Sequence, residues 1–153
     1  MDIKVYKKHK DATLPTRKHP EDAGLDLYCL EDISLLSNSI SVHRTGISLV
    51  IPPGFFGLIK PKGGSNHLVG AGVVDENYRG EILVKLVNPN EYSNLNFVKG
   101  SAIAQIIIVP VIYPTPLEID YDPEKKLSTT RGSSGGIWDS TFEDVDVYYI
   151  NGD

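Results

Sequence analysis

The sequence of 153 residues has almost no cysteine and no long apolar run. Cys29 is the single cysteine, which excludes an internal disulfide and any metal site built from several cysteines. A free thiol suits a reducing compartment, and the N-terminal residues contain no apolar stretch like that of a signal peptide. No segment approaches the roughly 18 apolar residues of a membrane span. We therefore expect no membrane partner and a cytoplasmic location, or a nuclear one in a eukaryotic or viral source.

Positive charge is also scarce. Fifteen Lys and Arg stand against twenty Asp and Glu, a net charge of -5, so we expect no general basic surface for nucleic acid. An anionic ligand would need locally concentrated cations or a metal ion. The four histidines are scattered without metal-binding spacing. We expect no direct set of protein ligands, so that a metal would be a hard cation held mainly by phosphates and water.

Alanine is rare as well, with five residues against twenty-eight Ile and Val. Residues that are β-branched favour strands, and few alanines leave little support for helices. Fourteen Gly and ten Pro interrupt the chain at short intervals, which is typical of an all-β barrel or sandwich. Strands are predicted at residues 3–6, 25–29, 46–51, 57–60, 81–87 and 103–109, with a weaker candidate at 94–98.

The apolar pattern ends near Pro110. A tail without a core pattern of its own packs on a partner or stays mobile. We predict one β domain over residues 1–128 and a C-terminal arm over residues 129–153, which ends in an acidic tail.

The stretch GAGVVDENYRGEI, residues 70–82, concentrates polar side chains in what reads as a strand end, a tight turn and a second strand. A carboxylate at a strand end, such as Asp75, can orient and deprotonate a water molecule. Tyr78 offers a flat face to a sugar or a base, and Arg79 can pair with an anion or stabilise the turn. The composition fits an ordinary polar β-turn equally well.

Other stretches place polar side chains in strands and in a loop. Asp26 alternates with Leu25 and Leu27, so its side chain points away from theirs, as that of a simple exposed residue would. The loop KPKGGSNH, residues 60–67, suits either a phosphate cradle or an ordinary solvated loop. Gln105 interrupts an apolar strand, where a buried amide needs partners from the backbone or from a ligand.

The segment TTRGSSGGIWDST, residues 129–141, combines one Arg with several Gly, Ser and Thr. Such a segment can close over a phosphate chain. Taken alone, it is more typical of a disordered linker.

The order of these stretches resembles the trimeric dUTP pyrophosphatase (dUTPase) family, which has five motifs. AGLDLY, KPKGGS, GAGVVDENYRGEI, KGSAIAQIII and TTRGSSGGIWDST resemble motifs one to five in turn, and the resemblance spans about residues 23–141. It implies a jelly-roll-like distorted β-barrel (the β-clip fold) with an extended C-terminal arm. It also implies a homotrimer with active sites at subunit interfaces, and Mg2+-dependent hydrolysis of dUTP to dUMP and pyrophosphate.

The resemblance assigns roles to individual residues. It implies that Asp75 activates the water that attacks the α-phosphorus, with Asp26 near the metal-bound phosphates and Gln105 on a phosphate oxygen. Tyr78 would stack on deoxyribose and leave no room for a 2′-hydroxyl, and a hairpin around residues 70–74 would present its backbone to uracil. The other substrate-binding positions that the resemblance implies are Lys62, Gly63, Gly64, Ser65, Gly70, Gly72, Val73, Arg131, Gly136, Ile137 and Trp138.

Motifs two and five depart from the family pattern. Motif two usually reads Pro-Arg-Ser-Gly before a short helical segment, whereas here Lys62 replaces Arg, Gly63 replaces Ser, and about four residues are missing after them. Lysine keeps the charge without the fork geometry of arginine, and Ser65 is the remaining hydroxyl. In motif five, Ile137 takes the place of the Phe that stacks on uracil, with Trp138 beside it.

Two other interpretations stay open. A catalytically impaired relative that binds nucleotide or a protein partner fits the altered motifs, although such a scaffold does not need Asp26, Asp75, Tyr78 and Gln105 together. A dCTP deaminase shares the fold but carries a catalytic Glu where Lys85 stands, which disfavours deamination.

Overall fold

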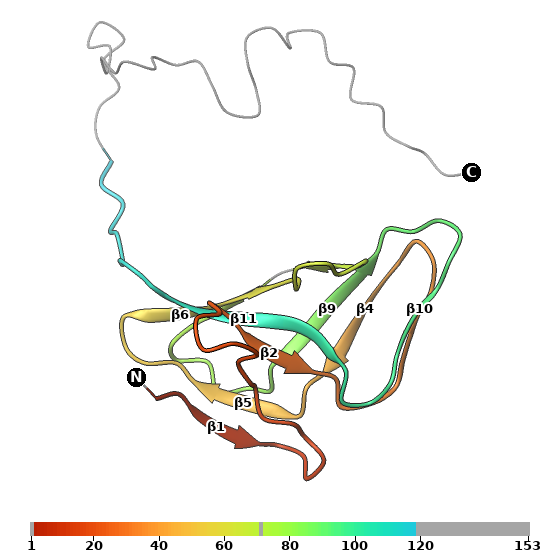
Figure 1. The fold of residues 1–153 in the computed structure, drawn as a ribbon. Helices are drawn as coiled ribbons and strands as arrows, with labels where there is room; N and C mark the ends of the chain where they lie inside the picture. The colour runs from red at the N-terminus through yellow and green to blue at the C-terminus, as the bar shows by residue number, and fades with distance from the viewer. Residues whose placement is uncertain (1, 71, 119–153) are drawn as a thin grey trace, which may run out of the picture. The chain divides into compact units, whose positions relative to one another are not determined.

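The computed structural model describes residues 2–70 and 72–118. These residues form strands and no helix, so none of them builds a helix long and apolar enough to cross a membrane. Eleven strands follow one another along the described chain (Figure 1). They are β1 (Lys4–Lys7), β2 (Leu25–Tyr28), β3 (Ile33–Leu35), β4 (Ser39–Arg44), β5 (Ile47–Val50), β6 (Phe55–Lys60), β7 (Leu68–Gly70), β8 (Val73–Val74), β9 (Leu83–Asn88), β10 (Leu95–Phe97) and β11 (Ala102–Pro110).

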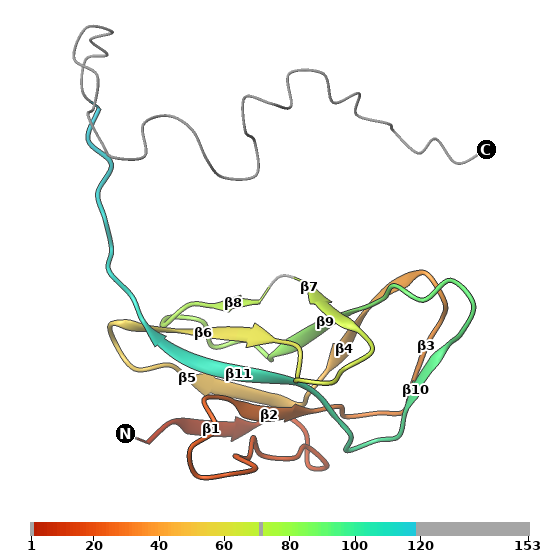
Figure 2. The same ribbon diagram turned by 45° about the horizontal axis from the view of Figure 1, so that its top comes forward.

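The strands form small antiparallel sheets whose neighbours are mostly distant in sequence. The largest has the order β2-β11-β6-β8 and the next has the order β4-β9-β7, while β1 pairs with β5 and β3 with β10. Figures 1 and 2 show β11 running beside β6 and β2, with β1 and β5 on the adjacent side. This is the expected jelly-roll-like all-β fold, and the described residues form no closed barrel.

Alternation along the strands places one set of side chains in a common core. In β9, Val84 and Leu86 are buried while Leu83 and Lys85 are exposed. Burial of an aliphatic side chain of this size contributes about 1.5–3 kcal/mol, so the core fixes which face of each strand points outward. The largest fully buried apolar side chains are Leu27, Leu35, Ile47, Leu49, Ile51, Ile82, Leu86, Ile103 and Ile106.

All the predicted strands are present, including the weaker candidate, with ends shifted by one or two residues. Strands β3, β4, β7 and β8 were not among the predicted ranges. Strand β4 reads SISVHR, and its apolar members Ile40 and Val42 are exposed while Ser41 and His43 are half-buried. The side chains of Ser41 and His43 satisfy each other through a 2.6 Å hydrogen bond, and burial lowers the pKa of His43. Because the apolar residues face outward and the polar ones inward, the sequence pattern did not indicate a strand here.

The strands belong to a compact unit, Met1–Tyr113, which precedes a second unit, Pro114–Asp153. Residues 114–118 are exposed and form no helix or strand. The predicted boundary after residue 128 and the predicted arm lie outside the described residues and stay predictions.

Candidate functional site

Strand β8 holds the start of the Asp75 segment against β6. Val73 and Val74 pair with Leu58 and Gly57, and the Ile59 N–H donates a 2.6 Å hydrogen bond to the carbonyl oxygen of Gly72. Strand β7 bonds instead to β9. The prediction of one hairpin over residues 70–74 is therefore wrong, because its two halves belong to different sheets. Nothing in the local sequence shows that the chain passes from one sheet to another at this point.

After β8 the chain makes a tight turn over residues 75–79. The Tyr78 N–H donates to the Asp75 carbonyl oxygen at 3.1 Å. Arg79 donates from Nη1 to the carbonyl oxygens of Glu76 (2.6 Å) and Tyr78 (2.8 Å). The guanidinium thus stabilises the turn, as the sequence suggested. This support holds Asp75 directly after β8, which is only two residues long.

The turn lines a hollow of about 170 Å³, which we call the Asp75 hollow. Asp75, Val73 and Tyr78, all predicted site residues, share its wall, which consists of Ile59, Val73, Val74, Asp75, Tyr78, Glu81, Ile82 and Leu83. Tyr78 is 43% exposed, and its hydroxyl donates to the Glu81 carbonyl oxygen at 3.0 Å. The ring is thus held by its tip and leaves a face free. Asp75 and Val73 also border a second hollow of about 350 Å³.

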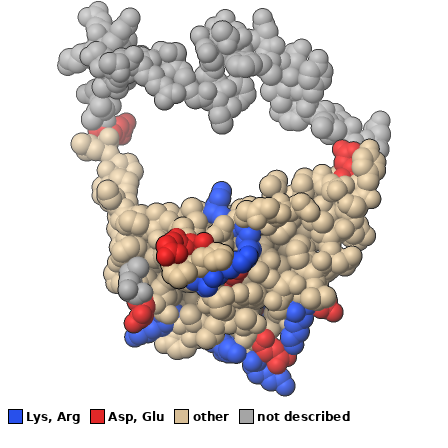
Figure 3. All heavy atoms as spheres, viewed as in Figure 1, with Lys and Arg blue, Asp and Glu red and all other residues tan. Residues whose placement is uncertain are grey.

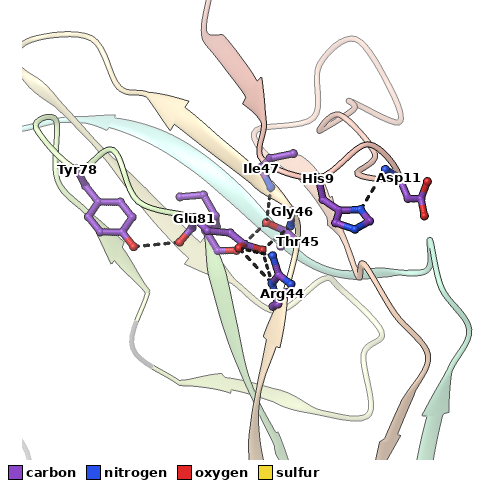
Figure 4. A network of polar contacts seen from close by, with 9 residues as sticks. His9, Asp11, Arg44, Thr45, Gly46, Ile47, Tyr78 and Glu81 are labelled. Atoms are coloured by element: carbon purple, nitrogen blue, oxygen red, sulfur yellow. Dashed lines mark hydrogen bonds and ion pairs between the residues drawn. The ribbon is translucent and has the colours of Figure 1, made fainter.

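Glu81 also lines the Asp75 hollow, and Figure 4 shows the polar contacts that hold it. Its carboxylate accepts hydrogen bonds from the Arg44 guanidinium, at 3.0–3.2 Å, and from the Gly46 N–H at 2.8 Å. Burial opposes ionisation of Glu81, but the hydrogen bonds and charge of Arg44 and the Gly46 N–H outweigh it, so the pKa of Glu81 is lowered. The Thr45 hydroxyl adds a 2.6 Å bond to the Ile82 carbonyl oxygen. Nothing in the local sequence around Glu81 or Arg44 indicates this network.

A second cluster gathers where β6 ends, and we call it the Asp26 corner: Asp26, Lys62 and Gln105. In the sheet, Gln105 lies opposite Asp26 on one side and Lys60 on the other. The Lys62 ammonium forms an ion pair with the Asp26 carboxylate, whose side chain is 17% exposed. Asp26 is therefore half-buried and paired rather than a simple exposed residue.

Gln105 is held in place within this corner. Its side-chain N–H donates to the Pro61 carbonyl oxygen at 2.8 Å. Its amide oxygen lies directly over Gly24, where a Cβ atom would overlap it. The backbone thus satisfies the donor of this amide, and the buried glycine gives its oxygen room.

The loop after β6 is short and open. The Ser65 N–H donates to the Lys62 carbonyl oxygen at 3.1 Å, and Gly64 has a φ of 78°, which an L side chain rarely adopts. Neither Gly63 nor Gly64 has an atom within 4 Å of a Cβ position. His67 ends the loop as a buried anchor, with its ring 2.7 Å from the Ile103 carbonyl oxygen and edge-on to Phe97.

Other predicted site positions have simpler outcomes. Gly70 closes β7, where an added Cβ would lie 3.1 Å from Lys85. The predicted positions Arg131, Gly136, Ile137 and Trp138 lie outside the described residues.

In residues 2–70 and 72–118, no group of three or more His, Cys, Asp or Glu is placed to hold a metal ion. On the face shown in Figure 3, basic and acidic side chains are interspersed.

Comparison with known proteins decides the family. The dUTPase family model matches residues 10–141. A deoxyuridine 5'-triphosphate nucleotidohydrolase of Mycolicibacterium vanbaalenii is 36% identical over 140 residues, which cover 87% of this chain and 91% of the relative. One of Gloeothece citriformis is 38% identical over 141 residues, with 88% and 94% covered. This chain belongs to the dUTPase family. The expectation of a dUTPase-family enzyme is thereby confirmed.

Solved dUTPase structures confirm the fold. The dUTPase of Staphylococcus bacteriophage 80alpha with dUPNHPP superposes with a TM-score of 0.79 at 22% identity, covering 88% of this chain and 96% of that one. A mutant dUTPase of phage phi11 of S. aureus, described with a structural Mg(II) ion, gives a TM-score of 0.73 at 21% identity, with 79% and 98% covered.

Proposed function

We propose that this chain hydrolyses dUTP to dUMP and pyrophosphate, with a water molecule that Asp75 deprotonates as the nucleophile on the α-phosphorus. Membership of the dUTPase family supports the substrate. The observation that carries the mechanism is the Asp75 hollow, in which the exposed carboxylate and the Tyr78 ring share one wall. A carboxylate held at a strand end by a stabilised turn is suited to accept a proton from a positioned water.

In this proposal Tyr78 selects the sugar. Because its hydroxyl is tied to the Glu81 carbonyl oxygen, the ring cannot swing away to admit a larger sugar. Deoxyribose packs against the free face, and a 2′-hydroxyl finds neither space nor a partner there. The Tyr78→Ala variant should therefore lose discrimination between dUTP and UTP.

The Asp26 corner would receive the phosphates. Lys62 supplies the positive charge, and Gln105 supplies an amide next to the same strand end. The oxygens of Asp26 and Gln105 are hard donors that suit Mg2+. The Lys62 ammonium already beside Asp26 favours a metal held mainly by the triphosphate and water, with Asp26 accepting from a bound water. When bound, Mg2+ would offset the negative charge of the phosphates.

We further propose that the active unit is a homotrimer with sites shared between chains. Asp75 follows Val74, which lies opposite Gly57, whereas Gln105 lies opposite Lys60. At roughly 3.3 Å per residue their backbone positions are about 13 Å apart along β6. The two groups thus lie toward different ends of β6, as expected if each serves a site shared with another copy. Sharing between copies would join the two halves.

An exposed apolar face supports association between copies. The outer surface of the β4-β9-β7 sheet carries Ile40, Val42, Leu68 and Leu83, with exposures of 66%, 54%, 55% and 47%. Contiguous apolar residues on one sheet face mark an interaction surface. Leu83 of this face also lines the Asp75 hollow, so a copy bound to the face would lie near Asp75.

The direct test is pyrophosphate release from dUTP with Mg2+. Wild type should turn over dUTP, and Asp75→Asn should reduce kcat by about 10²–10⁴-fold because it removes the general base. dCTP serves as the control for deamination, which should be absent because Lys85 on β9 stands where dCTP deaminases carry a catalytic Glu. Equal rates for wild type and Asp75→Asn would contradict the mechanism.

The alternative is a catalytically impaired dUTPase-like protein that acts as a nucleotide-binding or protein-interaction module. The observation that favours it is motif two: Gly63 brings no hydroxyl, and Lys62 is already engaged by Asp26. Saturable binding of a non-hydrolysable dUTP analogue without any dUTP turnover would support this alternative over hydrolysis.

A further inference from the structure

Glu76, the residue directly after Asp75, ties two otherwise separate parts of the chain together. Its side-chain Oε2 accepts a 2.7 Å hydrogen bond from the Gly54 N–H and another of 2.7 Å from the Tyr113 hydroxyl. Gly54 lies in the turn between β5 and β6, with a φ of 79°, and Tyr113 closes the compact unit. Glu76 is half-buried, whereas Asp75 and Asn77 beside it are exposed.

The loop that carries Asp75 has two hydrogen-bonded attachments to other elements among the described residues. The Ser48 hydroxyl donates to the Arg79 carbonyl oxygen at 2.9 Å and holds the far end of the loop. Glu76 holds the near end, one residue from the carboxylate that is proposed to act as the base. The other hydrogen bonds of the turn are internal to it. The bond to Gly54 therefore sets how Asp75 leaves β8.

The same turn also receives the end of the compact unit. Gly54 accepts a 2.9 Å hydrogen bond from the Val111 N–H through its carbonyl oxygen, while its own N–H donates to Glu76. The Tyr113 hydroxyl donates to the same Glu76 oxygen that accepts from Gly54. Glu76, Val111 and Tyr113 border the second hollow, of about 350 Å³, which Asp75 and Val73 also line.

We propose that Glu76 is a positioning residue for the hydrolysis proposed above: one carboxylate clamps the Asp75 loop to the Gly54 turn and to Tyr113. Through this clamp, the orientation of Asp75 depends on the positions of Val111 and Tyr113, which follow β11. The electrostatics agree with an ionised carboxylate. The Tyr113 hydroxyl and then the Gly54 N–H lower the pKa of Glu76, and in turn Glu76 raises the pKa of Tyr113.

The test compares Glu76→Gln, Tyr113→Phe and the double variant in the full-length chain. Glu76→Gln should reduce kcat for dUTP by about tenfold and Tyr113→Phe by about threefold, in line with the loss of charged and neutral hydrogen bonds. KM should change little, because neither side chain holds substrate. Because both act through one clamp, the double variant should be no slower than Glu76→Gln. The matched controls are Glu91→Gln and Tyr92→Phe, exposed residues of the turn between β9 and β10, which should leave kcat unchanged.

A second readout does not depend on turnover. The Tyr113 ring, assigned by 13C NMR from the Tyr113→Phe spectrum, should titrate above an ordinary tyrosine in wild type and return toward about pH 10 in Glu76→Gln. Identical titrations, unchanged kcat in both variants, or losses that simply multiply in the double variant would overturn the inference. A wild-type chain without dUTP turnover would contradict the proposed function instead, and the titration alone would then decide whether the clamp exists.

Discussion

The Asp75 hollow and the Asp26 corner are built in different ways. The hollow comes mostly from one continuous stretch, residues 73–83, shaped by a turn and by backbone hydrogen bonds to neighbouring strands. The corner draws single side chains from β2, from β11 and from the loop after β6. Main-chain contacts hold the Asp75 hollow, whereas contacts made by side chains hold the Asp26 corner.

This difference predicts different responses to substitution. A backbone-built site resists small changes until a main-chain contact breaks, and then it fails together with the local fold. A side-chain-built site can lose one interaction while the fold survives. Glycines at the two sites offer matched probes of this contrast.

Gly72→Ala should have the largest effect. Its Cβ would overlap the Ile59 carbonyl oxygen, a backbone atom near the end of β6, so β8 must move off its partner strand. We expect a loss of about 1–3 kcal/mol in the free energy of unfolding together with most dUTP turnover. Urea denaturation and pyrophosphate release measure the two effects. Gly63→Ala is the control, because nothing lies within 4 Å of its Cβ; equal stability of the two variants would count against the backbone-built account.

Gly24→Ala should separate activity from stability. Its Cβ would overlap the amide oxygen of Gln105, which can rotate away because it belongs to a side chain. We expect turnover to fall by about tenfold, for the loss of one charge-assisted hydrogen bond to phosphate, with little change in the urea midpoint. In a Gln105→Ala background, Gly24→Ala should have no further effect on turnover. An additional loss in that background would show that Gly24 acts by some other route.

Glu81→Gln should weaken the hollow in a pH-dependent manner. The lowered pKa of Glu81 means that its carboxylate stabilises the fold above the unfolded value of about 4.3, and that this contribution is lost as pH falls through the lower, folded value. The variant should therefore be less stable than wild type at pH 7, by about 1–2 kcal/mol for the hydrogen bonds lost. The difference should shrink below pH 4. A difference that stays constant from pH 7 to pH 3 would rule out the ionised network as its source.

Restoring the family form of motif two should have the smallest effect. Gly63 has open space around its Cβ position and a φ that is not positive, so Gly63→Ser fits without strain. Lys62→Arg restores a fork that can bind two phosphate oxygens. We expect the double variant to raise kcat/KM for dUTP by a few-fold, with unchanged stability. A fall in kcat/KM would indicate that the Lys62–Asp26 pair is specifically adapted to this chain.

Much of the fold was predictable from the chain, since Ile- and Val-rich segments between Gly and Pro mark most strands. The position of Asp75 at a strand end and the turn-stabilising role of Arg79 also followed from local pattern. Contacts between distant residues did not. The Lys62–Asp26 pair, the Arg44–Glu81 network and the Glu76 clamp join positions far apart in sequence, and nothing in the local composition of either partner marks the other.

The missed elements have a common physical cause. Strand β4 was hidden because its apolar residues face outward, a pattern that makes sense only with a partner surface. The predicted hairpin at residues 70–74 was wrong because β7 and β8 join different sheets. Both errors arise where the chain is organised by its neighbours rather than by local propensity.

Subunit complementation tests most directly the claim that each chain carries two separated halves of a shared site. Asp75→Asn disables the hollow and Asp26→Asn disables the corner, so each variant alone should be nearly inactive on dUTP. If sites combine the hollow of one chain with the corner of another, random mixing of the two in trimers should leave about one quarter of the sites intact. The account predicts recovery of dUTP turnover toward that fraction once native mass spectrometry shows mixed assemblies. Mixed assemblies with no turnover above the separate variants would contradict it.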